Sequence, residues 1–194
     1  MSKGGGGTGL LHLSWEDVQR LAEVVAERVR ASGFTPDVVV AISRGGFSPA
    51  RILCDQLSIQ RLASLQIEYY TDVNQRRSDP QIVIPLNTDV PGLRAVVVDD
   101  VSDSGDTLRA ATDHVLDRGA SEVRVAALHV KPWSSFRPDY YAEEVDAWVV
   151  YPWETRETMM SMEAKLRGEG LGPNEVRHRL IEMGFSPDMV RKLL

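Results

Sequence analysis

Acidic side chains gather at the end of an apolar run in residues 95–107. Asp99 and Asp100 directly follow four apolar residues, and Asp103 comes three positions after Asp100. A buried strand that ends in clustered carboxylates is costly unless cations or hydroxyl groups meet them. Because carboxylates accept O–H hydrogen bonds and bind Mg²⁺, this cluster predicts a site for sugar hydroxyls and a divalent cation.

A second chemical group follows at once, in the small turn made by Ser104, Gly105, Asp106 and Thr107. A glycine-containing turn that enters a helix leaves backbone N–H groups at the positive end of the helix dipole, an arrangement that suits a phosphate. The hydroxyls of Ser104 and Thr107 add donors. Since the carboxylates would repel a phosphate, we expect them to hold a sugar attached to it.

Three other interpretations of this stretch are open. A hydrophobic strand that ends in two aspartates also occurs in Walker B motifs, but the chain has no GxxxxGK[ST] segment. A receiver-type acidic pocket has its acid pair after the first strand, whereas here the pair lies past the middle of the chain. The third interpretation is a solvated acidic turn with a helix cap, and the pairing of acids with a phosphate turn argues against it.

The elements that must position these residues follow from the apolar pattern. Helical spacing starts after Ser14, which with Asp17 resembles a capping box, and a second helix is predicted to be capped by Ser48. Strands are predicted at 37–42, 64–70, 82–86, 94–100, 122–130 and 146–152, and helices at 14–33, 48–57 and 107–118. Such alternation predicts an α/β fold with a mostly parallel sheet flanked by helices.

Three unusual segments follow strand ends in this scheme: the Ser-Arg-Gly-Gly turn at 43–46, the acidic stretch at 99–107 and the polar loop at 71–81. Ligands of parallel sheets bind at the carboxyl ends of the strands, so these segments should converge on one edge. The loop is polar enough to close over that edge, with Arg76 and Arg77 as phosphate contacts.

Bulk properties narrow the possible partners. The 194 residues carry a formal net charge of −6, which argues against general nucleic-acid or membrane-surface binding. No apolar run approaches the roughly 18 residues of a membrane span. The one cysteine, Cys54, cannot form an internal disulfide, and this predicts a reducing, cytoplasmic setting.

The stretch Val-Val-Val-Asp-Asp-Val-Ser-Asp-Ser-Gly-Asp-Thr at 96–107 resembles the signature of type I phosphoribosyltransferases. Segments at 41–57, 69–76, 129–141 and 147–154 are similar to the corresponding parts of bacterial xanthine-guanine phosphoribosyltransferases. The resemblance covers 10 to about 155. It implies a phosphoribosyltransferase domain with a small hood at 10–155. The glycine-rich residues 1–9 are expected to be a flexible lead, and residues 156–194 a C-terminal helical extension.

The last 24 residues are expected to form two short helices around a Gly-Phe-Ser-Pro turn. Met183-Gly184-Phe185 is similar to the loop of ubiquitin-associated domains, but those domains need three helices. An element for packing or oligomerisation is the favoured interpretation.

The resemblance implies a reaction in which phosphoribosyl pyrophosphate (PRPP) and a 6-oxopurine give a nucleoside monophosphate and pyrophosphate. It implies Mg²⁺ as cofactor, a cytoplasmic location and a homodimer or homotetramer. On the sugar-phosphate side, the turn Ser104–Thr107 would grip the 5′-phosphate. Asp99 and Asp100 would meet the ribose hydroxyls directly or through Mg²⁺, with Asp100 as a metal ligand. Arg44 and Gly45 would contact the pyrophosphate.

On the base side, the resemblance implies that Asp103 is the general acid/base beside purine N7. Lys131 would donate to purine O6, and the ring of Trp148 would stack on the base. The backbone of Trp148 and Val149 would read the purine edge. Asp106 departs from the family pattern, which often has glycine or lysine at this position. Its charge has no evident partner in the sequence.

Two rival functions stay open. One is a nucleotide- or PRPP-sensing regulator built on the same fold, although such regulators usually add a DNA-binding module or a basic face. The other is a phosphoribosyltransferase for another base, such as orotate or uracil, which Lys131, Trp148 and Asp103 argue against. The preferred 6-oxopurine and the role of the tail at 165–194 are not predicted by the sequence.

Overall fold

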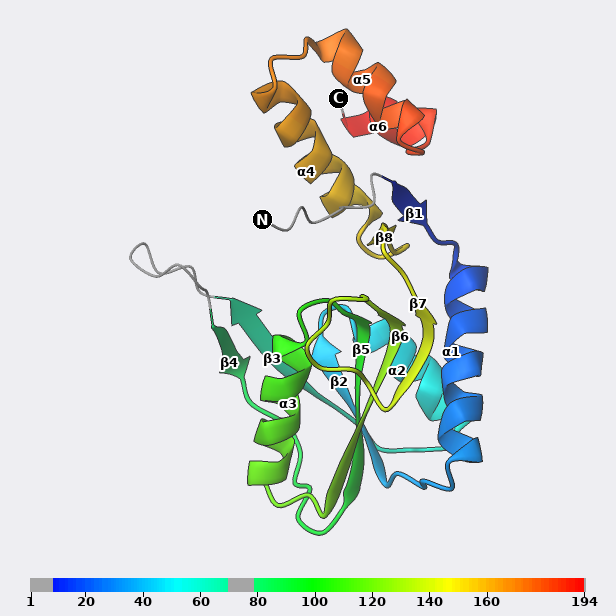
Figure 1. The fold of residues 1–194 in the computed structure, drawn as a ribbon, viewed down its shortest axis with the longest axis vertical. Coiled ribbons are helices and arrows are strands. Elements are labelled where there is room, and N and C mark those ends of the chain that lie inside the picture. The colour runs from blue at the N-terminus through cyan, green and yellow to red at the C-terminus, as the bar shows by residue number, and fades with distance from the viewer. Residues whose placement is uncertain (1–8, 70–78, 194) are drawn as a thin grey trace. The chain divides into compact units, whose positions relative to one another are not determined.

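In the computed structural model, a six-stranded sheet with the order β4-β3-β2-β5-β6-β7 organises residues 18–145 (Figure 1). The structure describes residues 9–69 and 79–193, so most of the predicted lead, and Arg76 and Arg77 of the predicted closing loop, lie outside the described residues. The strands are β2 (Val38–Ser43), β3 (Leu62–Tyr69), β4 (Pro80–Ile84), β5 (Arg94–Ser102), β6 (Glu122–Val130) and β7 (Tyr140–Glu144). All neighbouring strands run parallel except β3 and β4, which confirms the predicted mostly parallel sheet.

Helices cover both faces of this sheet, as predicted. They are α1 (Trp15–Ala31), α2 (Phe47–Gln56) and α3 (Asp106–Asp117). Figure 1 shows α3 on one side of the sheet, and α1 and α2 on the other. Ser14 and Asp17 form the expected capping box, since the Asp17 N–H donates to Ser14 Oγ at 3.1 Å and the Ser14 N–H to Asp17 Oδ2 at 3.0 Å.

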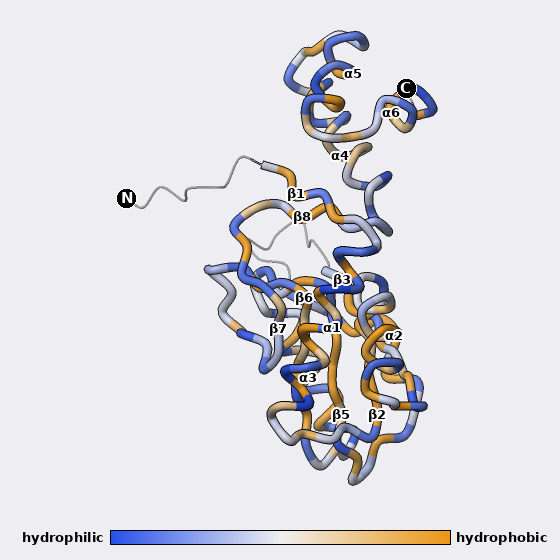
Figure 2. The backbone as a smooth tube through the Cα atoms, turned by 90° about the vertical axis from the view of Figure 1, so that its right-hand side faces the viewer, coloured by the Kyte–Doolittle hydropathy of each residue, from blue (hydrophilic) through white to orange (hydrophobic). Residues whose placement is uncertain are grey.

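The central strands are buried on both faces because they are β-branched or small throughout. In β2, Val38 to Ile42 are at most 3% exposed, and Figure 2 shows β2 and β5 as hydrophobic along most of their length. Leu108, Ala111 and Val115 of α3 pack in one cluster with alternate strand residues. This burial fixes the register of β5 and hence the place where its acidic end emerges.

Two features of residues 18–145 differ from the sequence-based expectation. The prediction of Ser48 as a helix cap was wrong, because α2 begins at Phe47 directly after Gly46. A Cβ on Gly46 would lie 2.2 Å from the carbonyl oxygen of Val98, so this residue must be glycine for the turn to pack on β5. Strand β7 was not predicted, since its sequence ends in two glutamates and follows a proline-containing turn.

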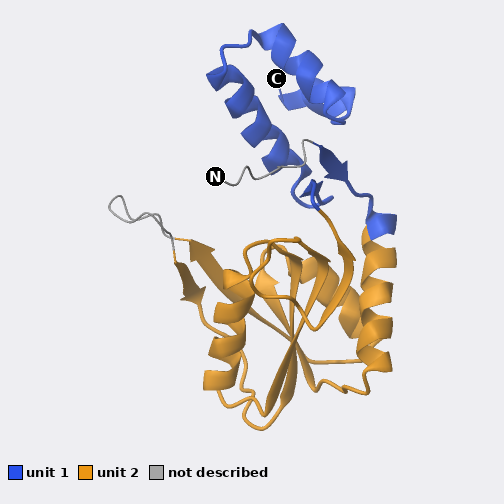
Figure 3. Ribbon diagram, in the orientation of Figure 1, with its two compact units in different colours: residues 1–17, 146–194 blue, residues 18–145 orange. Residues whose placement is uncertain are grey.

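A second compact unit, shown in blue in Figure 3, consists of residues 1–17 and 146–194. The strand predicted over 146–152 forms here as β8 (Trp148–Val150), paired in parallel with the short strand β1 (Leu10–His12). Three helices follow: α4 (Thr155–Gly168), α5 (Pro173–Glu182) and α6 (Pro187–Leu193). The two short helices expected around the Gly-Phe-Ser-Pro turn are α5 and α6, which confirms that prediction.

Phe185 supports the packing interpretation of this tail. Its ring is 2% exposed and lies in a core cluster with Val150, Met159 and Leu180. The ring of His12 meets it edge-on at 5.0 Å between centroids, and His12 Nε2 lies 2.8 Å from the carbonyl oxygen of Met183. The Met-Gly-Phe segment is therefore used inside this unit, where it joins the helices to β1.

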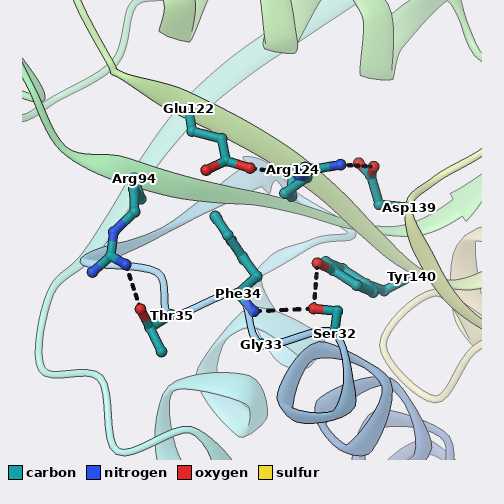
Figure 4. Close-up of a pocket in the computed structure, with 9 residues that line it drawn as sticks. All are labelled: Ser32, Gly33, Phe34, Thr35, Arg94, Glu122, Arg124, Asp139 and Tyr140. Carbon is teal, nitrogen blue, oxygen red and sulfur yellow. Dashed lines mark hydrogen bonds and ion pairs between the residues drawn. The ribbon is translucent and has the colours of Figure 1, made fainter.

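Ion pairs and hydrogen bonds line a pocket of about 390 Å³ at the amino ends of the strands in the sheet (Figure 4). Arg124 contacts Glu122 at 2.8 Å and Asp139 at 3.1 Å, and Arg94 bonds to Thr35. Arg94 also donates to both carboxylate oxygens of Asp37, at 3.0 and 3.1 Å. The charges of this pocket thus pair with one another and tie the strand starts together.

The Asp37–Arg94 pair predicts a specific pH dependence of stability. The Arg94 hydrogen bonds lower the pKa of Asp37 to about 2, below the usual value of about 4. The stabilisation by ionised Asp37 is therefore complete above about pH 4, and roughly half of it is lost by pH 3. The free energy of unfolding in urea should be higher for the wild type than for Asp37→Asn at pH 6. This difference should shrink as the pH is lowered to 3. A difference that stays constant would contradict the prediction.

Candidate active site

The end of β5 presents two adjacent carboxyl groups. Asp100 is 9% exposed and Asp99 is partly buried. The Asp100 N–H donates to Asp99 Oδ1 at 3.0 Å, and the Val101 N–H donates to Asp100 Oδ1 at 2.8 Å. Burial, and then the neighbouring Asp100 carboxylate, raise the pKa of Asp99 well above its usual value. A cation or hydroxyl donors placed against this pair would relieve that cost.

The turn after β2 packs directly against Asp100. It contains a non-proline cis peptide between Ser43 and Arg44, and the Gly46 N–H donates to the Ile42 carbonyl oxygen at 2.9 Å. A Cβ on Gly45 would lie 2.3 Å from Asp100 Oδ2, so only glycine allows this approach. The structure thus brings the Arg44–Gly45 backbone to the same edge as the acid pair.

The turn at 104–107 has the form expected of an anion site. Gly105 adopts a left-handed conformation (φ 91°) immediately before α3, and a Cβ there would lie 2.6 Å from Phe136. Its place at the amino end of a twelve-residue helix directs N–H groups and the positive helix dipole outward.

Asp106, whose charge had no partner in the sequence, has one in the structure. Ser104 Oγ donates to Asp106 Oδ2 at 2.9 Å and accepts from the Asp106 N–H at 3.2 Å. Asp106 also begins α3, where the helix dipole favours a negative charge. A carboxylate at this position is therefore compatible with the turn, although it engages the Ser104 hydroxyl.

Asp103 and Lys131 both contact the side chain of Trp133. Asp103 is exposed, and its Oδ1 accepts a hydrogen bond from Trp133 Nε1 at 2.8 Å. Lys131 is 7% exposed, and its Nζ lies 5.6 Å from the centroid of the Trp133 ring. The two predicted base-side residues of this unit are thus brought together.

Sequence reasoning missed two residues of this region. Trp133 lies within a segment that was matched to the family but was given no role, and the Lys-Pro-Trp order directly after β6 was the available signal. Tyr69, at the end of β3, has its hydroxyl 3.1 Å from Thr107 Oγ1. Nothing in the sequence linked Tyr69 to Thr107, because the contact depends on strand order.

Trp148 and Val149 belong to the other unit. The Trp148 side chain is 59% exposed, whereas Val149 is 6% exposed and packs inward. The Trp148 N–H donates to the Gly9 carbonyl oxygen at 3.3 Å as part of the pairing with β1. The exposed indole is available for contact, and its backbone is tied to β1 on one edge.

Within the described residues, no group of three or more His, Cys, Asp or Glu side chains could hold a metal ion. Asp99 and Asp100 nevertheless fit Mg²⁺, which commonly binds through one or two carboxylates and completes its shell with water and substrate phosphates. No helix in the described part of the chain is long and apolar enough to cross a membrane.

Comparisons with known proteins agree on one family. Residues 14–159 match the model of the phosphoribosyl transferase domain. The chain is 28% identical over 159 residues to a xanthine-guanine phosphoribosyltransferase of Gluconobacter oxydans, covering 81% of this chain and 92% of that protein.

Solved structures resemble the chain over a similar span. A purine phosphoribosyltransferase from Pyrococcus horikoshii is 37% identical with a TM-score of 0.67, and the match covers 75% of this chain and 94% of the other. A protein from Neisseria gonorrhoeae with bound ppGpp is 28% identical with a TM-score of 0.68, covering 75% and 89% of the two chains.

Proposed function

This chain belongs to the phosphoribosyltransferase family, and from that premise we propose that it transfers the phosphoribosyl group of PRPP to a 6-oxopurine: guanine, xanthine or hypoxanthine. Its mostly parallel sheet with flanking helices is the type I phosphoribosyltransferase fold. The observation that carries the proposal is the meeting, at one edge of the sheet, of the acid pair, the turn at 104–107, and Asp103 with Lys131. The related enzymes from Gluconobacter and Pyrococcus, named for purines, support the choice of base.

In this proposal the 5′-phosphate binds at Ser104–Thr107, and Asp99 and Asp100 accept the ribose hydroxyls. The N9–C1′ bond forms as the bond from C1′ to the pyrophosphate oxygen breaks, so positive charge develops on the ribose ring. Fixed carboxylates nearby stabilise that charge. Arg44 and the Gly45 backbone hold the departing pyrophosphate, which leaves with its electron pair.

Mg²⁺ is proposed as the cofactor, which Asp100 would hold with Asp99 beside it. When bound, Mg²⁺ neutralises charge on the pyrophosphate group. The like-charged, partly buried pair at the end of β5 supports this assignment, since such a pair favours a cation.

On the base side, Asp103 is proposed to take the proton from purine N7 as N9 attacks C1′. Lys131 donates to O6, and Trp148 stacks on the ring while the Trp148–Val149 backbone reads the purine edge. A 6-oxo group accepts a hydrogen bond from the Lys131 ammonium. A 6-amino group is itself a donor and would face the ammonium without forming a hydrogen bond. This preference supports oxopurines over adenine.

A cytoplasmic homodimer or homotetramer completes the proposal. The single cysteine, Cys54, is buried, which fits a reducing compartment. The oligomeric state rests on the family resemblance, and light scattering on the purified chain measures it directly.

The experiment that tests the function is a base-by-base assay of pyrophosphate release with PRPP and Mg²⁺. Release is expected with one or more of guanine, xanthine and hypoxanthine. Turnover of orotate or uracil but not of purines would reassign the base. PRPP or nucleotide binding without turnover of any base would point instead to a regulator.

Replacing Lys131 with Ala is expected to raise the KM for the purine by about 10- to 100-fold, because a hydrogen bond from a charged donor contributes about 1.5–3 kcal/mol. The kcat and the KM for PRPP should change little. Lys165→Ala, at an exposed position in α4, is the matched control. A change only in melting temperature would instead make Lys131 a structural residue.

Replacing Asp106 with Asn is expected to lower the KM for PRPP about fivefold. The amide keeps an acceptor for Ser104 but removes a negative charge near the phosphate, and two charges about 4 Å apart in a solvated site interact by about 1 kcal/mol. Asp113→Asn, an exposed change within the same helix, is the control. An unchanged or raised KM would show that the Asp106 carboxylate does not oppose the substrate.

A further inference from the structure

Trp133 is half-exposed, and its indole contacts two residues that are proposed to bind the purine. The ring N–H meets Asp103, and the ring face meets Lys131. Its side chain is 55% exposed, so it adds little to the core. The ring N–H donates to Asp103 Oδ1 at 2.8 Å, while the ring face lies 5.6 Å from Lys131 Nζ. A packing role does not explain a large, solvated ring whose edge and face each hold a charged group.

The backbone around Trp133 is fastened independently of its side chain. The Lys131 N–H donates to the Ser102 carbonyl oxygen at 2.9 Å, and the Ser135 N–H donates to the Ser104 carbonyl oxygen at 2.9 Å. Ser135 Oγ donates to the same Ser104 oxygen at 2.7 Å. Residues 131–136 are therefore braced against the turn that contains Asp103, and this brace fixes where the indole points.

We propose that Trp133 is a positioning residue for both proposed contacts to the purine: its N–H orients the Asp103 carboxylate beside N7, and its ring face orients the Lys131 ammonium beside O6. This inference rests on the proposed function. An indole N–H only donates, so it binds one oxygen of the Asp103 carboxylate. The second oxygen of that carboxylate stays available to take the purine N7 proton. Aspartate and lysine side chains otherwise lose rotamer freedom when the purine binds, and a fixed indole removes part of that cost beforehand.

Two substitutions separate the two contacts. Trp133→Phe removes the N–H and keeps an aromatic face, whereas Trp133→Leu removes both. Trp133→Phe should lower kcat about tenfold, the loss expected for one hydrogen bond to a charged group, and leave the purine KM within about twofold. Trp133→Leu should lower kcat similarly and also raise the purine KM. Trp15→Phe, at a tryptophan that is 56% exposed, should change neither constant.

Double-mutant cycles test whether Trp133 acts through its two partners. In an Asp103→Ala background, Trp133→Phe should cause no further loss of kcat. In a Lys131→Ala background, Trp133→Leu should no longer raise the purine KM. Losses that add in full in both backgrounds would overturn the positioning role while leaving the proposed function intact.

A measurement without turnover checks the hydrogen bond itself. The chain has four tryptophans, and Trp133→Phe assigns the Trp133 indole N–H signal in a ¹H–¹⁵N spectrum by its loss. Asp103→Ala should move that signal, and an unmoved signal would overturn the inference. Wild-type protein that turns over no purine would overturn the proposed function instead, so the two failures are distinguishable.

Discussion

Asp103→Asn is expected to lower kcat for the purine by about 10²- to 10⁴-fold, the usual contribution of one positioned acid or base. The amide is close in size to the carboxylate and keeps an oxygen acceptor for Trp133 Nε1, so the geometry of the turn is retained. What it loses is the ability to take the N7 proton. The KM for PRPP should stay within a few-fold, because the proposed role of Asp103 is at the base and not at the sugar phosphate.

Steady-state kinetics with PRPP and the preferred purine make this measurement. Asp89→Asn, another exposed loop aspartate of the same unit, is the matched control and should leave kcat unchanged. Unchanged turnover in Asp103→Asn would remove Asp103 from the chemistry. A large rise in the KM for PRPP with an unchanged kcat would move it to the sugar-phosphate side.

Gly45→Ala is expected to lower kcat/KM for PRPP by about 10²-fold, since an atom displaced by about 1 Å at a reacting site can cost that much. The added methyl group would lie 2.3 Å from Asp100 Oδ2, and its contacts extend to both oxygens of that carboxylate. Either the turn or the carboxylate must move. In both cases the proposed pyrophosphate contact at Arg44–Gly45 and the proposed ribose contact at Asp100 would move apart.

The control for this substitution is Gly168→Ala, where an added Cβ meets nothing within 4 Å. It should leave activity unchanged. Titration of PRPP followed by calorimetry shows whether the Gly45→Ala loss lies in binding, and a circular dichroism melt checks that the sheet is intact. Full activity in Gly45→Ala would show that the turn tolerates a side chain and does not approach Asp100 closely during turnover.

Much of this region was predictable because its chemistry is local in sequence. Asp99, Asp100, Asp103 and the turn at 104–107 all belong to one strand end and the helix that follows it. Apolar runs buried on both faces, as in β2 and β5, also made the parallel sheet predictable. Residues that follow neighbouring parallel strands meet at one edge, so the approach of Arg44 and Gly45 to the acid pair followed from the strands.

The remaining features depend on contacts between distant positions. Trp133 and Asp103 are 30 residues apart, and Tyr69 and Thr107 are 38 apart, so neither pair leaves a periodic signal. Strand β1 has only three residues, too few for an alternating pattern, and its partner β8 lies far along the chain. The start of α2 was misplaced because Ser-Pro is a common helix entry, whereas here the close approach of Gly46 to Val98 determines the boundary.

The pairing of β1 with β8, in the unit that also holds α4 to α6, constrains the order in which the chain folds during synthesis. The contact between His12 and Met183 joins residues that are synthesised 171 positions apart. At about 5–20 residues per second, that interval lasts roughly 10–35 s. Residues 18–145 hold all six strands of the main sheet and can pair during this time, whereas Leu10–His12 must wait for β8 and the helices beyond it. Vectorial translation therefore imposes an order in which β1 pairs with β8 only after all six strands of the main sheet have been synthesised.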